Sequence, residues 1–318
     1  MNKLYVLVGL PGSGKTWTAN RILATDPNAV WISSDAIREE LWGDANDQQN
    51  PSQVFGIMLL RTTEALMDGK NPIYDATNLI AKTRTNLLKQ LKSTVIVPFI
   101  AECWVVATKI SECKARQSLR DRKVPDEVID RMARQFQTPW YNEGWDKIRL
   151  ENNGPRYRLD IEHIKMNAVA HDNPHHTSSS LNAHCVAASA AFAKWSCCEE
   201  EDDNTDGIRG VLREAIYHHD IGKLKTKVFH DTKGNPTDIA HYYSHENMGA
   251  YMWLASFEAD AWDEFDALLI AALIQWHMQP YFVGNTVEGI TDWCVRKGFG
   301  VSFAEWLWIV HKADAEGH

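Results

Sequence analysis

The sequence predicts two parts: an α/β domain with a parallel sheet and flanking helices, followed by an all-α domain. Three observations predict this. Strand-like apolar stretches alternate with helical stretches through the first 150 residues, which is typical of a parallel sheet. A glycine-rich segment follows the first of these stretches. Beyond residue 160, apolar residues recur at helical spacing, and all thirteen histidines of the chain lie in that second part.

The first predicted strand, Leu4–Val8, runs into the phosphate-loop pattern GLPGSGKT and then into a helical stretch. In such a turn the backbone N–H groups and the positive end of the helix cradle a polyphosphate. Lys15 would reach the β- and γ-phosphates, and Thr16 would hold magnesium. The pattern therefore predicts a site for ATP and Mg²⁺, formed by Gly9, Pro11, Gly12, Ser13, Gly14, Lys15 and Thr16.

The rest of the first part continues the alternation of strands and helices. Further strands are expected at 29–33, 72–74 and 95–106, and helices at 53–68, 82–91 and 108–136, the last interrupted near Pro125.

Asp35 and Arg38 directly follow the second predicted strand. In open α/β sheets, catalytic groups lie at the edge formed by the carboxyl ends of the strands. Residues three apart share a helix face. Asp35 could accept the proton of an attacking hydroxyl, and Arg38 could grip a phosphate of the acceptor with its planar guanidinium. From their position alone, an N-cap aspartate and a surface arginine are an equally good interpretation.

Two more segments favour phosphoryl transfer. Asp75–Asn78 offers polar groups at the same edge of the sheet. Arg116 and Arg120 stand four residues apart, so on one helix they would share a face and could close over the transferred phosphoryl group. A solvated helix face is the alternative for this pair.

Residues 1–150 resemble the 5′-hydroxyl polynucleotide kinases of phage and bacterial nucleic-acid repair. The matching elements are the phosphate loop, SSDxIR, DATN, the RxxxR pair and the Pro…Glu-Gly-Trp ending. The resemblance implies Asp35 as general base for the 5′-OH and Arg38 on the neighbouring phosphate. It also implies Arg120, with Arg116, acting on the γ-phosphate, and more weakly Thr77 and Arg84 near the acceptor.

The second part is predicted to be helical at 181–195, 211–218, 245–257, 265–277 and 303–310. We expect domains at 1–155 and 165–318, separated near Asn152–Pro155. The acidic run 199–204 is interpreted as a solvated loop.

His219-Asp220 begins the strongest pattern of the second part, HDIGK, and further potential ligands stand on separate predicted helices. Helices that each deliver one or two ligands to a common point can build a two-metal centre. The candidate metal ligands are His184, His219, Asp220, His245, His277 and Asp314.

Residues 168–318 resemble the HD-domain phosphohydrolases, from the order of these ligands and the lead-in NPHH at 173–176. The resemblance implies His184, His219, Asp220 and Asp314 around one divalent metal, and Asp220, His245 and His277 around a second. It implies Lys223 on the substrate phosphate and His175 or His176 near the site. The donor set suits Mn, Fe, Ni, Co, Mg or Zn.

Composition excludes some functions. Residues 1–160 carry 22 Lys and Arg against 19 Asp and Glu, and residues 161–318 carry 11 against 23. This acidic balance argues against bulk binding of long duplex DNA. The longest apolar run, 267–274, is too short to span a membrane, and the six cysteines show no CxxC spacing. We therefore expect a cytoplasmic protein without a membrane partner.

Together the two parts predict a bifunctional enzyme that heals ends of RNA or DNA. One part would phosphorylate 5′-OH ends from an NTP donor, and the other would remove 3′-phosphate. The sequence does not decide whether the second part also hydrolyses 2′,3′-cyclic phosphate. Sealing would need a separate ligase. One rival is a small-molecule kinase fused to a nucleotide phosphohydrolase, which the acidic balance favours. Another is a nucleotide-gated binding protein with a structural metal site.

Overall fold

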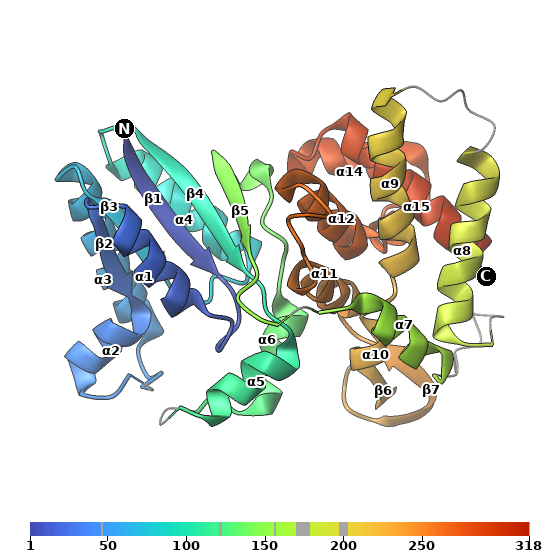
Figure 1. The fold of residues 1–318 in the computed structure, drawn as a ribbon, viewed down its shortest axis with the longest axis horizontal. Coiled ribbons are helices and arrows are strands. Elements are labelled where there is room, and N and C mark those ends of the chain that lie inside the picture. The colour runs from blue at the N-terminus through green and yellow to red at the C-terminus, as the bar shows by residue number, and fades with distance from the viewer. Residues whose placement is uncertain (46, 121–122, 156, 170–178, 197–202, 318) are drawn as a thin grey trace. The chain divides into compact units, whose positions relative to one another are not determined.

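A five-stranded parallel sheet organises the first unit of the computed structural model, which describes residues 1–45, 47–120, 123–155, 157–169, 179–196 and 203–317. The strands run in the order β2-β3-β1-β4-β5 (Figure 1). They are β1 (Asn2–Val8), β2 (Ala29–Ser33), β3 (Asn71–Asp75), β4 (Phe99–Val106) and β5 (Lys147–Glu151). Strand β1 lies in the middle and is buried from Leu4 to Val8, as expected for a sheet covered on both faces.

Helices connect these strands. They are α1 (Lys15–Thr25), α2 (Ser34–Trp42), α3 (Pro51–Met67), α4 (Ala81–Thr94), α5 (Ile110–Ser118), α6 (Asp126–Gln135) and the 3₁₀ turn η1 (Tyr141–Glu143). The chain runs outward from β1 to β2 through α1, and returns through α3 and α4. Because the crossovers keep one hand, α1 covers one face while α3 and α4 cover the other (Figure 1). The turn after β1 therefore lies where the strand order reverses, the usual ligand position in such sheets.

The predicted α/β domain with a parallel sheet is confirmed. Strand β5 was not predicted; its sequence was interpreted only as the closing segment of the domain. It pairs with β4 from Glu102↔Lys147 to Val106↔Glu151.

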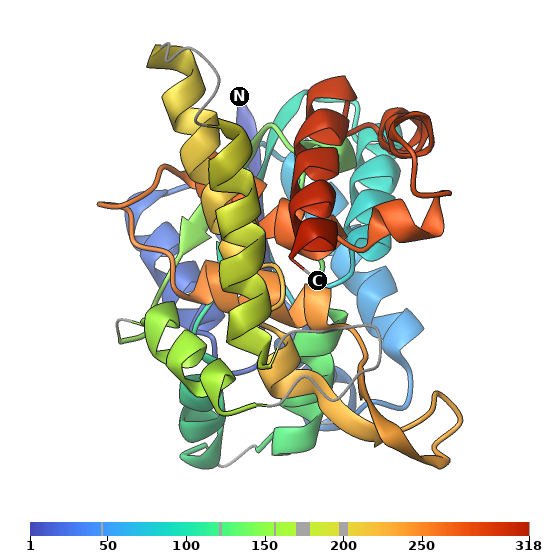
Figure 2. The ribbon, with the colours of Figure 1, turned by 90° about the vertical axis from the view of Figure 1, so that its right-hand side faces the viewer.

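The second unit is mainly helical. Its helices are α7 (Leu159–Asn167), α8 (Leu181–Ser196), α9 (Asp203–His218), α10 (Lys223–Thr226), α11 (His245–Ala255), α12 (Glu264–Trp276), α13 (Gln279–Phe282), α14 (Val287–Lys297) and α15 (Val301–Glu316). Helices α8, α9 and α15 pack together, and α12 packs on α9 and α11 (Figure 2). The apolar run 267–274 is completely buried inside α12. The predicted helical second part is confirmed.

One feature departs from an all-α second part. Strands β6 (Lys227–His230) and β7 (Pro236–Tyr242) form an antiparallel hairpin with a bulge between Val228 and His230. Within the described residues, no helix is long and apolar enough to cross a membrane.

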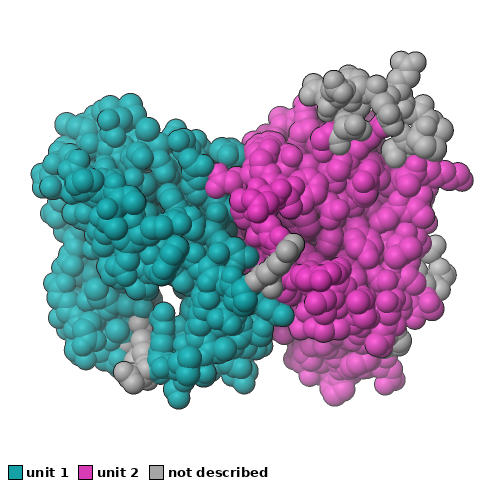
Figure 3. Space-filling view, in the orientation of Figure 1, with its two compact units in different colours: residues 1–132, 139–155 teal, residues 133–138, 156–318 magenta. Residues whose placement is uncertain are grey.

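The two compact units are residues 1–132 with 139–155, and residues 133–138 with 156–318 (Figure 3). Residues 133–138 pack with the second unit: Phe136 meets Tyr251 edge to face, and the Thr138 N–H donates to Gln275 Oε1 over 2.7 Å. His175, His176 and residues 199–202 of the acidic run lie outside the described residues; Asp203 and Asn204 begin α9.

Candidate active sites

The phosphate loop forms a tight turn between β1 and α1. Gly12 and Gly14 have φ values of +83° and +104°, a region that favours glycine. A Cβ on Gly12 would lie 2.3 Å from the carbonyl oxygen of Cys113, so the close approach of α5 to the loop also needs glycine there. The loop thus brings its backbone N–H groups to the start of α1, as phosphate binding requires.

Lys15 and Thr16 both line the cavity in front of the loop. The Lys15 ammonium group donates to the carbonyl oxygens of Gly9 and Leu10, over 2.9 and 2.8 Å. Burial lowers the pKa of Lys15, although nearby Asp75 acts in the opposite direction. A bound phosphate would supply further negative charge beside this buried ammonium.

Asp35 and Arg38 line the same cavity, on α2. Ser33 caps this helix, since its hydroxyl accepts from the N–H groups of Asp35 and Ala36. The Asp35 carboxylate is half exposed, and Arg38, which is almost completely buried, donates to it over 3.2 Å. Asp35 is therefore not the N-cap, and Arg38 is not a surface charge.

The cavity has a volume of about 700 Å³ and lies entirely within the first unit, which is hollowed in the space-filling view (Figure 3). Its polar wall joins the phosphate loop to Asp35, Arg38, Asp75 and Arg120. Its apolar wall comes from α3 and α6 and consists of Pro51, Phe55, Val128 and Met132.

Arg116 and Arg120, the RxxxR pair, do not share a helix face, contrary to prediction. Helix α5 ends at Ser118, so Arg120 lies beyond it and lines the cavity. Arg116 instead donates to the carbonyl oxygens of Gly12 and Asn153 and to Glu112. Arg116 therefore supports the phosphate loop, and it is not among the residues that line the cavity.

Arg84, implied more weakly near the acceptor, is not among the residues that line the cavity. Its side chain is fully buried and donates twice to the Glu143 carboxylate, over 2.7 and 2.5 Å, and once to the Asn78 carbonyl. This is a structural ion pair, which the sequence pattern alone could not distinguish from a phosphate-binding arginine. Thr77, by contrast, lines the cavity.

Six buried side chains of the second unit form two groups that could hold metal ions. They come from α8, the turn after α9, α11, the end of α12, and α15. The first group is His184, His219 and Asp314, and the second is Asp220, His245 and His277.

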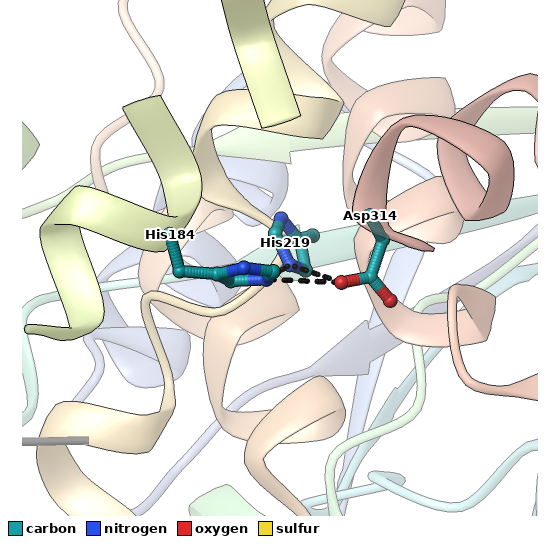
Figure 4. A group of neighbouring side chains, drawn as sticks. All are labelled: His184, His219 and Asp314. Atoms are coloured by element: carbon teal, nitrogen blue, oxygen red, sulfur yellow. Dashed lines mark hydrogen bonds and ion pairs between the residues drawn. The ribbon is translucent and has the colours of Figure 1, made fainter. Parts of the chain in front are cut away.

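In the first group the three side chains point toward one another (Figure 4). The Nε2 atoms of His184 and His219 lie 3.1 Å apart, and Asp314 Oδ1 lies 2.9 and 3.3 Å from them. Ligand atoms held at about 2.1 Å and at right angles around one cation would be about 3.0 Å apart. The spacing therefore fits a bound divalent cation.

The second group repeats this spacing. The Nε2 atoms of His245 and His277 lie 3.2 Å apart, and Asp220 Oδ1 lies 3.3 and 3.8 Å from them. The other oxygen of Asp220, Oδ2, lies 3.6 and 3.5 Å from the Nε2 atoms of His184 and His219. One carboxylate thus faces both groups, with one oxygen toward each.

All four histidines are oriented in the same way. Their Nδ1 atoms lie 2.7–3.2 Å from backbone carbonyl oxygens, those of Gly317, Ile216, Tyr242 and Ile274. A neutral histidine in this setting carries its proton on Nδ1 and turns the lone pair of Nε2 to the ligand group, as histidine ligands of metal ions usually do. Two such lone pairs about 3 Å apart need a positive charge between them.

The electrostatics agree with that need. Burial lowers the pKa of His219, but the Asp220 and Asp314 carboxylates outweigh burial and raise this pKa to about 9. Burial and the neighbouring His219 and His245 lower the pKa of His277 to about 3. Although burial opposes it, Lys223 and His219 hold the pKa of Asp220 well below its usual range. The two carboxylates thus favour positive charge at the ligand groups.

Lys223 and Tyr281 complete the surroundings of the carboxylates. The Lys223 ammonium lies 2.6 Å from Asp220 Oδ2. The Tyr281 hydroxyl donates to Asp314 Oδ2 over 3.1 Å. The sequence analysis missed Tyr281, since one tyrosine on the short helix α13 carries no pattern.

Comparison with known proteins gives a family match over most of the first unit. Residues 4–139 match a family model described as an AAA domain. A solved chain of the Pnkp1/Rnl/Hen1 RNA repair complex has 22% identity and a TM-score of 0.38, covering 42% of this chain and 43% of its own. A putative kinase from Chloroflexus aurantiacus has 16% identity and a TM-score of 0.39, covering 48% and 88%. No curated protein matches.

The aligned part spans less than half of that repair-complex chain. The family match, the parallel sheet and the loop from Gly9 to Thr16 together define the first unit as a P-loop kinase-like domain. Such a domain uses ATP and Mg²⁺.

Proposed function

We propose that the chain is a bifunctional nucleic-acid end-healing enzyme. Its first unit would phosphorylate 5′-OH ends of RNA or DNA, and its second would remove 3′-phosphate with a pair of divalent metals. The sealing step would belong to a separate ligase. This proposal extends the kinase-like first unit to a polynucleotide acceptor and the two ligand groups to a hydrolytic centre.

The kinase proposal rests on Asp35 and Arg38 lining one cavity with the phosphate loop. Asp35 accepts the proton of the 5′-OH as its oxygen attacks the γ-phosphorus of ATP, and the bond from that phosphorus to the β–γ bridging oxygen breaks to release ADP. Lys15 and Arg120 offset the charge on the transferred group. Arg38, held over Asp35, binds the next phosphate of the acceptor, which a free nucleoside lacks. Thr16 would hold the Mg²⁺ that offsets phosphate charge.

The hydrolase proposal rests on one observation above all: Asp220 turns one oxygen to each ligand group. Two divalent metals, when bound, would activate water and stabilise the leaving oxygen of a phosphate ester. The four histidines would hold them as neutral donors. Lys223, 2.6 Å from Asp220, would bind a phosphate oxygen of the substrate.

The rival substrate class is small molecules, which the acidic balance of the chain favours. Transfer from labelled ATP to a 5′-OH oligonucleotide, compared with nucleosides and sugars, tests the first activity. Phosphate release from a 3′-phosphorylated oligonucleotide, before and after chelation and metal restoration, tests the second. We expect transfer to the oligonucleotide, no transfer to nucleosides, and metal-dependent release. Transfer to nucleosides or sugars alone would establish the rival.

A further inference from the structure

The segment from Lys223 to Tyr243, which includes the β6–β7 hairpin, carries more positive than negative charge in an acidic part of the chain. Residues 223–243 contain four of the eleven Lys and Arg of residues 161–318, against two acidic residues, Asp231 and Asp238. The Asp231 carboxylate is occupied by the turn, where it accepts from the N–H groups of Lys233 and Asn235, each over 2.8 Å. This segment, with four lysines and two aspartates, therefore has a net charge of +2 in a region with 23 acidic residues.

The same hairpin exposes aromatic and apolar groups. On β7, Ala240 and Tyr242 are buried, so the alternating residues Ile239 and His241 lie on the opposite face. The rings of His241 and Tyr243 stack with an interplanar angle of 5° and centroids 5.3 Å apart. Ile239 is 44% exposed. Stacked rings beside lysines are the combination by which proteins hold single-stranded nucleic acid.

Both ends of the hairpin reach the metal-ligand groups. Before β6, the Lys223 ammonium lies 2.6 Å from Asp220 and 5.5 Å from the centre of the Tyr242 ring. After β7, the Tyr242 carbonyl oxygen lies 2.9 Å from Nδ1 of His245. A single-stranded polynucleotide that lies on the hairpin would therefore end next to the metal-ligand groups.

We propose that this hairpin binds the single-stranded polynucleotide whose 3′ end enters the second unit's site. Lys227 and Lys233 contact backbone phosphates, and Tyr243 with His241 stacks a base near the end. The inference rests on the proposed function for the nature of the end, while the binding surface stands on charge and rings alone. Lys225 belongs to α10, 4.0 Å from Glu162, and is not part of this surface. A second copy pairing along the hairpin edge is the competing occupant.

The test uses the full chain and a labelled single strand of about twelve nucleotides, a length suited to one such site. Phosphates at both ends of this probe deprive the first unit of its acceptor hydroxyl. Tyr243→Ala is expected to weaken binding about tenfold or more, and Tyr243→Phe, which keeps the ring, to restore it. Lys227→Ala with Lys233→Ala should reduce the slope of log affinity against log salt by about 1.4. Arg296→Ala, an exposed cation on α14, is the matched control and should bind like the wild type.

Unchanged affinity in the Tyr243→Ala and double-lysine variants would overturn the inference. So would a changed oligomeric state by light scattering with unchanged affinity, which would show that a second copy uses this edge. Phosphate release from the same oligonucleotide separates the two proposals. Hairpin-dependent binding without any release would contradict the hydrolase and leave the binding surface standing. Phosphate release with an unaltered KM in the hairpin variants would contradict the binding surface and leave the hydrolase proposal standing.

Discussion

Backbone carbonyl groups decide which nitrogen each ligand histidine offers. His184, His219, His245 and His277 all turn Nδ1 to a carbonyl oxygen, in three cases that of the residue three positions earlier. The sequence shows which residue types are present but not this orientation, because it depends on local helix ends and, for His184, on Gly317 at the far end of the chain. These contacts keep the four Nε2 atoms directed at the ligand groups.

Tyr281 holds the oxygen of Asp314 that faces away from His184 and His219. Tyr281→Phe removes this hydrogen bond, and loss of such an outer contact typically weakens metal binding by about 10–100-fold. Because Tyr281 is 40% exposed and water can replace the hydroxyl, we expect about tenfold. Competition with a chelator measures it. Tyr217→Phe, on a ring that stacks on His163, is the control. Equal affinities in both variants would show that Tyr281 does not position Asp314.

The Arg84–Glu143 pair stabilises the first unit. Both side chains are buried, and Trp145 also donates to Glu143 over 2.9 Å. Removing one partner leaves a buried charge uncompensated, so Arg84→Ala should lower the free energy of unfolding of this unit by about 3–5 kcal/mol. Urea unfolding of the full chain, followed at the first unit's transition, measures it. Arg61→Ala, in an exposed pair with Glu40, should cost at most about 1 kcal/mol. Equal losses would refute the structural role of Arg84.

At the scale of elements, the sequence predicted regular stretches well and their ends poorly. The alternation around the phosphate loop was sufficient to predict four strands. The β6–β7 hairpin was not predicted because polar and apolar residues mix on β6 and β7, where only Ala240 and Tyr242 are buried. The prediction that Arg116 and Arg120 share a helix face was wrong because α5 ends at Ser118, before Arg120.

The turn from α9 to α10 depends on Gly222. A Cβ there would lie 1.9 Å from the carbonyl oxygen of His245 and 2.6 Å from the nitrogen of Gly249. Gly222→Ala must therefore push the turn away from α11 and separate Asp220 from His245. We expect reduced metal content by elemental analysis and a lower melting temperature. Gly207→Ala, on α9 with no atom within 4 Å of the new Cβ, should stabilise by up to about 1 kcal/mol. Wild-type metal content in Gly222→Ala would contradict this packing.

At the scale of the whole molecule, the chain contains two compact units, each with its own cluster of charged residues. In the first, the phosphate loop, Asp35 and Arg38 line one cavity. In the second, four buried histidines surround Asp220 and Asp314. The described residues that line the cavity all belong to the first unit, and the six ligand candidates all belong to the second. We therefore expect the two proposed activities to be separable.

Assay of both ends of one oligonucleotide with Asp35→Ala and Asp220→Asn in the full chain tests this separation most directly. Loss of the general base should reduce 5′ phosphorylation by about a hundredfold or more and leave 3′-phosphate release intact. Asp220→Asn should abolish phosphate release and leave 5′ phosphorylation intact. Loss of both activities in either folded variant, or phosphate release that survives Asp220→Asn, would contradict the account.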